Sequence, residues 1–124
     1  MINVGKINNM QIVKEVDFGL YLDSQKYGEI LLPKRYIPEG CEVGDFIDVF
    51  IYLDSEDQLI ATTETPLAMV EEFAFLKAVA VNRVGAFLDW GLMKDLFVPF
   101  KEQLETMVEG QSYMVYVYYD YESE

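Results

Sequence analysis

The side chains that most often carry enzyme chemistry are scarce in this chain. Its 124 residues include no histidine and a single cysteine, Cys41, whose glutamate neighbours give no stabilisation to a thiolate. Carboxylates are plentiful, with 22 Asp and Glu against 9 Lys and Arg, but at this composition paired acids occur by chance. The sequence contains no nucleophile motif, phosphate-binding loop or Cys/His ligand cluster. We therefore predict a protein that is not an enzyme and that uses no cofactor or metal.

Aromatic side chains, which make up 15% of the residues, offer a different chemistry, namely contact with a flat or apolar partner. In the alternating segment Phe46–Leu53, the branched aliphatic residues would fill one face, so Phe50 and Tyr52 would point outward. Burial of such rings under the chain's own loops is the alternative. We predict that aromatic residues form an interface with a partner domain or copy, and that its members are Phe50, Tyr52, Trp90, Tyr116 and Tyr118.

The elements that must position these residues are repeated, because one module occurs twice at a constant offset along the chain. The second copy aligns with the first without a gap and keeps two glycines, a proline and the apolar positions, which predicts two copies of one backbone. The identical residues of the first copy are Gly19, Leu22, Asp23, Pro33, Gly44, Val49, Tyr52 and Asp54, and they recur as Gly85, Leu88, Asp89, Pro99, Gly110, Val115, Tyr118 and Asp120.

Each copy shows the period of two that is typical of strands. In the second copy, the segment Glu102–Val108 before the last strand is expected to form two helical turns. Five short strands with one such connector predict an OB-type barrel. The strands predicted in the first copy are Gly5–Glu15, Gly19–Leu22, Glu29–Leu32, Phe46–Leu53 and Leu59–Thr63. Those predicted in the second copy are Phe73–Val81, Gly85–Asp89, Asp95–Val98 and Tyr113–Tyr119.

The predicted architecture is all-β, with two tandem five-stranded antiparallel OB-fold barrels at residues 1–64 and 73–124 and a linker at residues 65–72. In the alignment of the two copies Gln58 corresponds to Glu124, so the second barrel is expected to lack its closing strand. Backbone donors and acceptors along that open seam would remain unpaired. We therefore expect self-association through the second barrel.

The strings on the second and third predicted strands carry a family resemblance. The segments Val16–Leu22 and Glu29–Lys34 resemble the S1-type RNA-binding domain. In the second copy, Gly-Ala-Phe-Leu-Asp-Trp-Gly at 85–91 and Lys-Asp-Leu-Phe-Val-Pro at 94–99 resemble the conserved virulence factor B family of bacterial RNA-binding proteins. The resemblance implies three S1-like barrels followed by a winged-helix domain, in a protein that binds RNA and affects gene expression. This chain would then be the first two barrels.

The resemblance also implies which side chains stack on single-stranded nucleic acid. In S1-type domains these are two aromatic residues of the second strand and a histidine that ends the third. The first copy has Phe18 and Tyr21 at the aromatic positions, and the second has only Phe87, because Val84 replaces the leading aromatic residue. A proline occupies the histidine position in both copies. For Phe18 and Tyr21 the alternative is packing on neighbouring side chains. For Trp90 two roles stay open: it seals a barrel mouth or the domain joint, or it stacks on a base.

Net charge bears on the same question. Residues 1–64 hold 5 basic and 12 acidic side chains (−7), and residues 65–124 hold 4 and 10 (−6), which together give −13. Proteins that bind phosphates are usually basic, so contact with RNA requires a local patch. We predict that the patch consists of Phe18 and Tyr21 with Lys14, Lys34 and Arg35.

Two functions stay open at this point. The first is a single-stranded RNA-binding module of a bacterial post-transcriptional or virulence regulator, auxiliary to downstream S1-like and winged-helix domains. The second is an acidic protein-interaction or scaffold module that does not contact RNA. Because the sequence has no signal peptide, no apolar run of about 20 residues and no pair of cysteines, we expect it to be cytoplasmic and without membrane contact.

Overall fold

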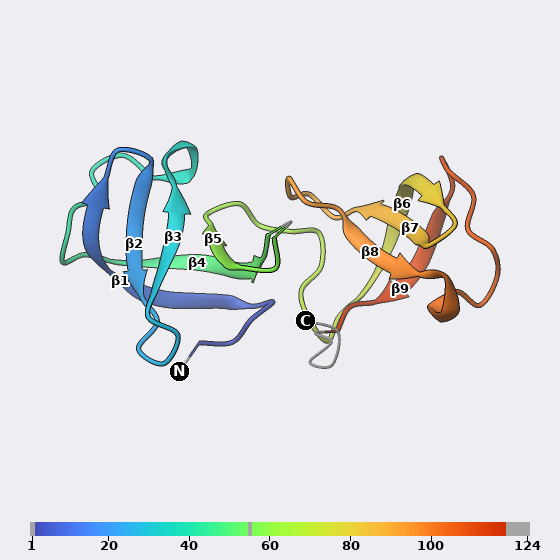
Figure 1. Ribbon diagram of the computed structural model, residues 1–124, viewed down its shortest axis with the longest axis horizontal. Coiled ribbons are helices and arrows are strands. Elements are labelled where there is room, and N and C mark those ends of the chain that lie inside the picture. Colours follow the sequence, from blue (N-terminus) through green and yellow to red (C-terminus); the bar gives the residue numbers. More distant parts are fainter. Residues whose placement is uncertain (1, 55, 119–124) are drawn as a thin grey trace. The chain divides into compact units, whose positions relative to one another are not determined.

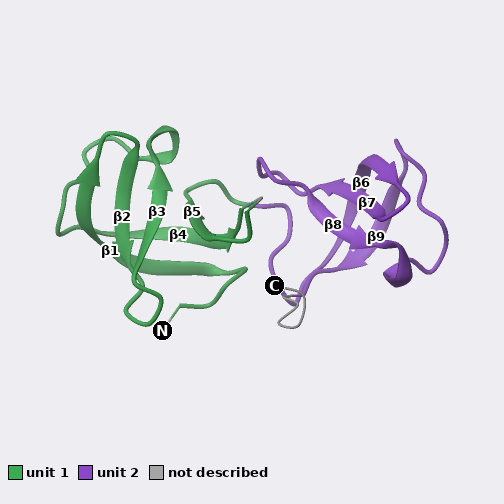
Figure 2. Cartoon of the chain, in the orientation of Figure 1, with its two compact units in different colours: residues 1–65, 119–124 green, residues 66–118 purple. Residues whose placement is uncertain are grey.

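The chain is all-β and consists of two compact units, Met1–Thr65 and Pro66–Tyr118 (Figure 2). The computed structural model describes residues 2–54 and 56–118. The predicted class, two tandem OB-like modules, is confirmed. Within the described ranges, no helix has the length and apolar character that crossing a bilayer requires.

The first unit is a closed barrel whose five strands follow one another around the barrel in the order β1-β2-β3-β5-β4 (Figure 1). All neighbours pair antiparallel except β3 and β5, which pair in parallel. A short 3₁₀ helix, η1 (Lys34–Tyr36), follows the third strand directly. The strands are β1 (Ile7–Val16), β2 (Gly19–Asp23), β3 (Glu29–Pro33), β4 (Phe46–Leu53) and β5 (Leu59–Thr62).

Alternation of side chains along the strands fills the interior of this barrel. Every second residue points inward, and these inward positions hold almost only aliphatic side chains. Tyr36 of η1 and Ile37 after it pack against the resulting cluster. The buried members of the cluster are Met10, Ile12, Leu20, Leu22, Ile30, Leu32, Val49, Ile51 and Ala61.

The second unit is a half-barrel: a four-stranded sheet in the order β8-β7-β6-β9 (Figure 1). In the first unit, β4 pairs with a strand on both sides, whereas within residues 66–118 its counterpart β9 pairs only with β6. The expected absence of a fifth strand therefore agrees with the described part of this unit. Its elements are β6 (Phe73–Asn82), β7 (Gly85–Asp89), β8 (Leu96–Pro99), the 3₁₀ helix η2 (Phe100–Glu102) and β9 (Ser112–Tyr116).

The two units share one strand register when the two copies are aligned. Ile7 pairs with Phe50 in the first unit, and the corresponding residues Phe73 and Tyr116 pair in the second. Both long first strands also contain a bulge at the same position, Val13 in β1 and its counterpart in β6. The gap-free repeat therefore describes the backbone as well as the sequence.

The segment 102–108 differs from the sequence-based prediction, because it is not α-helical. Only Phe100–Glu102 form a helical turn, and the chain after it is irregular. The Gln103 side chain explains the difference: its Oε1 accepts a hydrogen bond from the Met107 backbone N–H at 3.0 Å, in place of the backbone carbonyl that a helix would use. The Val108 N–H is likewise satisfied by the Tyr113 hydroxyl at 2.7 Å.

Candidate functional site

A row of three side chains crosses β1, β2 and β3 on the outer face of the first barrel. Lys14 pairs with Tyr21, and Tyr21 pairs with Leu31. The bulge at Val13 sets this row, because the extra residue shifts the register so that Lys14 lies opposite Tyr21. The Lys14 Nζ lies 5.0 Å from the centre of the Tyr21 ring, which is a cation–π contact.

Phe18 lies beside Tyr21, the middle residue of this row. Phe18 occupies the turn between β1 and β2, and its ring meets the Tyr21 ring edge-on with 6.2 Å between centroids. Phe18 is 57% exposed and Tyr21 is half-buried, so the pair presents an open aromatic surface to solvent. Neither ring belongs to the interior cluster, but the two rings contact each other and Tyr21 also contacts Lys14, so the stacking role and the packing alternative both stay predictions.

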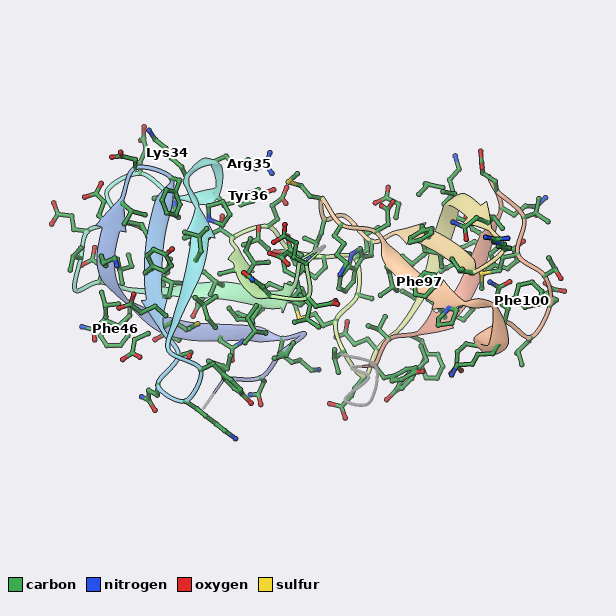
Figure 3. The ribbon with its side chains drawn as sticks, viewed as in Figure 1. Lys34, Arg35, Tyr36, Phe46, Phe97 and Phe100 are labelled. Carbon is green, nitrogen blue, oxygen red and sulfur yellow. The ribbon has the colours of Figure 1, made fainter. Side chains whose placement is uncertain are left out.

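Two of the predicted basic residues, Lys14 and Lys34, lie next to this aromatic pair. The Lys34 backbone N–H donates to the Phe18 carbonyl at 3.0 Å, so the start of η1 is fixed beside the β1–β2 turn. Lys34 is exposed and forms no ion pair with any residue that the structure describes. Lys14 lies 3.8 Å from Glu29, an exposed ion pair that contributes little and leaves the cation accessible. Figure 3 shows Lys34, Arg35 and Tyr36 following one another at the end of β3.

Arg35 is oriented by the residue that follows it. Its guanidinium lies 5.0 Å from the centre of the Tyr36 ring, and that ring packs against the barrel interior. The Tyr36 carbonyl accepts a hydrogen bond from the Thr63 hydroxyl, which ties η1 to the chain after β5. The cation at this position is therefore presented from a fixed backbone and not from a free loop.

The aromatic residues predicted to form an interface divide into two groups. Tyr116 and Tyr118 are exposed, as expected, but Phe50 and Tyr52 are not: their exposed fractions are 0% and 8%. The inward-facing residues of β4 were predicted correctly, because the interior cluster contains Val49 and Ile51 and neither of the two rings. Both rings are nevertheless covered, and they stack on each other with 5.9 Å between their centroids. Burial of the phenol raises the pKa of Tyr52, and the nearby Tyr36 and Glu64 raise it further while Arg35 opposes them.

Trp90 is also buried, with 7% of its surface exposed. Its Nε1–H donates to the Lys94 carbonyl at 2.7 Å, which closes the loop between β7 and β8. A buried indole whose donor is already used does not offer a face to a base, so the stacking alternative for Trp90 is wrong. Its predicted place in an interface stays a prediction.

Two aromatic residues of the second unit were not among the predicted site residues. Phe97 lies opposite Phe87 in the β7–β8 register, with 5.1 Å between ring centroids, and Phe100 follows β8 at the position that corresponds to Lys34 (Figure 3). The pairing of β7 with β8 places residue 97 directly opposite residue 87, whereas the sequence predicted these two strands but no register between them. The family motif has no counterpart to this neighbour, and so a transfer of family positions does not find it.

The fold and this surface together define a class of protein: a tandem of OB-type β-modules with aromatic and basic side chains on the outer face of the first three strands of the first barrel. The model of the S1 domain family matches residues 4–64, which is almost the whole of the first unit. The predicted resemblance to S1 domains and to conserved virulence factor B is thereby confirmed.

Two relatives of known sequence match parts of the chain. The chain is 34% identical over 95 residues to the "Uncharacterized protein YitL" of Bacillus subtilis, covering 76% of this chain and 32% of that protein. It is 33% identical over 61 residues to the "Conserved virulence factor B" of Staphylococcus aureus, covering 49% of this chain and 20% of that protein. The chain thus matches a third or less of the length of these relatives.

A solved structure shares the fold. It is a multidomain protein with nucleic acid binding domains from Streptococcus pneumoniae, which superposes with a TM-score of 0.80 at 22% identity. The match covers 96% of this chain and 43% of that one. At this identity the likeness supports the fold of the chain.

Proposed function

We propose that the chain binds single-stranded RNA, through a surface of the first barrel made of Phe18, Tyr21, Lys14, Lys34 and Arg35. The observation that carries the proposal is that four of these residues meet at one exposed aromatic pair: Phe18 and Tyr21 pack edge-on, Lys14 lies over the Tyr21 ring, and Lys34 is bound through its backbone to Phe18. Arg35 is the next residue of η1, with its guanidinium over the Tyr36 ring. Stacked bases on Phe18 and Tyr21 would leave the backbone phosphates beside the cations. The S1 family match of residues 4–64 supports the same ligand class.

The setting we propose is a bacterial, cytoplasmic regulator of gene expression after transcription. The likeness to conserved virulence factor B supports this setting. With a net charge of −13, the chain repels RNA at long range, so its own affinity is expected to be modest. We therefore propose that the two modules assist further RNA-binding domains and do not act as the main binding site.

The test is a titration of a labelled single-stranded RNA of about ten nucleotides with the whole chain, at several salt concentrations. Replacing Phe18 and Tyr21 together by alanine is expected to weaken binding by about 1–3 kcal/mol for each base that loses its stacking partner. Replacing Lys34 and Arg35 together by alanine is expected to flatten the salt dependence by about 0.7 for each phosphate that is no longer neutralised.

A matched control is available at the other end of the β2–β3 hairpin. There the Lys26 Nζ lies 5.5 Å from the centre of the exposed Tyr27 ring, which repeats the chemistry of the proposed site away from it. Replacing Lys26 and Tyr27 by alanine removes one charge and one exposed ring, and we expect RNA affinity to change less than twofold. An equal loss of affinity in this variant and in the variants of the proposed surface would show that binding is non-specific.

An acidic protein-interaction module is the second candidate, and the net charge of −13 is the observation that favours it. It predicts no binding of RNA even at low salt, together with salt-sensitive binding of a basic protein.

Unchanged RNA affinity in the Phe18/Tyr21 and Lys34/Arg35 variants would contradict the proposed surface.

A further inference from the structure

The second unit has three phenylalanine residues on the elements that correspond to the proposed RNA surface of the first unit. They are Phe87 on β7, Phe97 on β8 and Phe100 of η2, and we refer to them as the phenylalanine platform. Phe87 is half-buried, whereas Phe97 is 41% exposed and Phe100 is 55% exposed. The Phe100 N–H donates to the Val84 carbonyl at 3.0 Å, which fixes this residue at the start of β7.

Gly85 holds the Phe97 ring in place. A Cβ added at Gly85 would lie 2.7 Å from Cε1 and 2.9 Å from Cζ of Phe97, so the ring rests directly on the bare backbone of β7. The same ring also meets Phe87, with an angle of 37° between the two planes. The ring is therefore positioned before any ligand arrives, which lowers the entropy lost on binding.

The charges around the platform differ from those of the first unit. In the alignment of the two copies, Lys14 is replaced by Ala80 and Lys34 by Phe100, and of the three cations of the proposed RNA surface only Arg35 has a basic counterpart, Lys101. The row Lys14–Tyr21–Leu31 thus becomes Ala80–Phe87–Phe97, a row without charge. The row itself suits the flat, apolar face of a base, and the cations at this end of the unit, Arg83 next to Val84 and Lys101 next to Phe100, stand outside it.

We propose that the phenylalanine platform binds unpaired nucleobases by stacking, with little dependence on salt, and that the first unit provides the salt-dependent phosphate contacts. The inference rests on the proposed function, because it assigns separate parts of RNA binding to the two units. Every base has a π face, so the platform accepts any unpaired base.

The experiment compares two probes that differ only in their bases: an oligouridine RNA of about ten nucleotides and an abasic ribose-phosphate strand of equal length. The protein is the whole chain, either unchanged or with Phe97→Leu and Phe100→Leu, which keep apolar side chains and remove the rings. We expect the double variant to bind oligouridine at least about fivefold more weakly, with an unchanged salt slope and unchanged binding of the abasic strand.

The control variant carries Phe73→Leu and Phe75→Leu, which change two exposed phenylalanines of β6. Its affinity for oligouridine is expected to stay within twofold of the unchanged chain. The single variant Phe100→Leu, which leaves the Gly85–Phe97 packing untouched, is expected to show part of the loss. Thermal unfolding of each variant verifies that the fold is kept.

The outcomes separate this inference from the proposed function. If the unchanged chain binds RNA through Lys34 and Arg35 but the Phe97/Phe100 variant binds equally well, the platform is overturned and the proposed function stands. A double variant that loses affinity for the abasic strand to the same degree also overturns it, because stacking requires bases. If the unchanged chain binds no RNA at low salt, both are overturned.

Discussion

Tyr52 is a buried phenol near three groups that carry or gain negative charge, namely Tyr36, Glu64 and Asp54. Burial is the largest cause of its raised pKa, followed by Tyr36 and then Glu64. The folded state therefore resists ionisation of Tyr52 more than the unfolded chain does. Stability from this residue is complete below the ordinary tyrosine value of 10.0 and is lost as the pH rises through the folded-state pKa.

We expect Tyr52→Phe to reduce the alkaline loss of stability. Denaturant unfolding between about pH 8 and pH 11 should show a shallower decline in the free energy of unfolding than in the unchanged chain. Tyr27→Phe is the control, because it removes the same hydroxyl group from an exposed tyrosine. Parallel declines in the Tyr52→Phe variant and the unchanged chain would contradict the assignment.

At the scale of elements, Gly19 and Gly85 allow the second strand of each unit to approach the third closely. A Cβ at Gly85 would lie 2.4 Å from the Val98 carbonyl oxygen, and one at Gly19 would lie 2.3 Å from that of Leu32. Since these are backbone atoms of a paired strand, they cannot move without breaking the sheet. This close approach explains why glycine recurs at this position in both copies.

Gly85→Ala is therefore expected to lower the free energy of unfolding by about 1–3 kcal/mol, as overpacking does in a tight core. The variant should also lose oligouridine affinity, because the added methyl group displaces the Phe97 ring. Gly110→Ala is the comparison, since its Cβ would meet no atom within 4 Å and only its positive φ of 91° is strained. Equal stability in the two variants, with unchanged RNA affinity, would count against this role of Gly85.

The elements that were predicted correctly are those whose pattern is local. The alternation in Phe46–Leu53 and Gly85–Asp89 matches β4 and β7 residue for residue. Two features that were predicted wrongly depend on tertiary structure. The helix expected at 102–108 does not form, because the Met107 N–H donates to the Gln103 side chain. Phe50 is buried in β4, where its neighbours on the adjacent strands are Ile7 and Thr62, which are distant in the sequence.

The candidate site was predictable to the same extent. Family positions led to Phe18 and Tyr21, whose side-by-side arrangement the structure shows. Phe97 and Phe100 lie at positions where the first copy has Leu31 and Lys34, so a residue-by-residue transfer between the copies passed over them. Only the register of β7 with β8 shows that Phe97 joins Phe87.

At the scale of the whole molecule, one end of the outward face of β6 and β9 is apolar, up to Lys77, while the chain as a whole is strongly acidic. Phe73, Phe75, Met114 and Tyr116 are all exposed there, and the segment 111–118 contains no charged side chain. Edge strands that lack charges pair readily with other chains. In the first unit, the counterparts of Phe75 and Met114 are Asn9 and Asp48, whose side chains share a hydrogen bond of 2.9 Å.

We expect the chain to self-associate through this face, with a dimer population that grows with protein concentration. Added salt should strengthen the association, because it screens repulsion between chains of charge −13. Phe75→Asn with Met114→Asp, which installs the residues of the first unit, should restore the monomer in sedimentation velocity. Phe46→Ser changes another exposed phenylalanine, on the first unit (Figure 3), and should have no effect. A monomer at every concentration would contradict the expectation.

The pair Asn9–Asp48 has a consequence for how a duplicated chain folds. Because the two units share one register, β1 has two possible partners during folding, β4 and the equivalent β9. If β1 paired with β9, Asn9 would lie opposite Met114 and its amide would lack Asp48 as an acceptor. If β6 paired with β4, Phe75 would lie opposite Asp48. The wrong pairings thus lack both the polar contact and the apolar one. The divergence of the two copies at these positions makes each strand selective for its own partner, and strand exchange between the repeats is disfavoured before either sheet is complete.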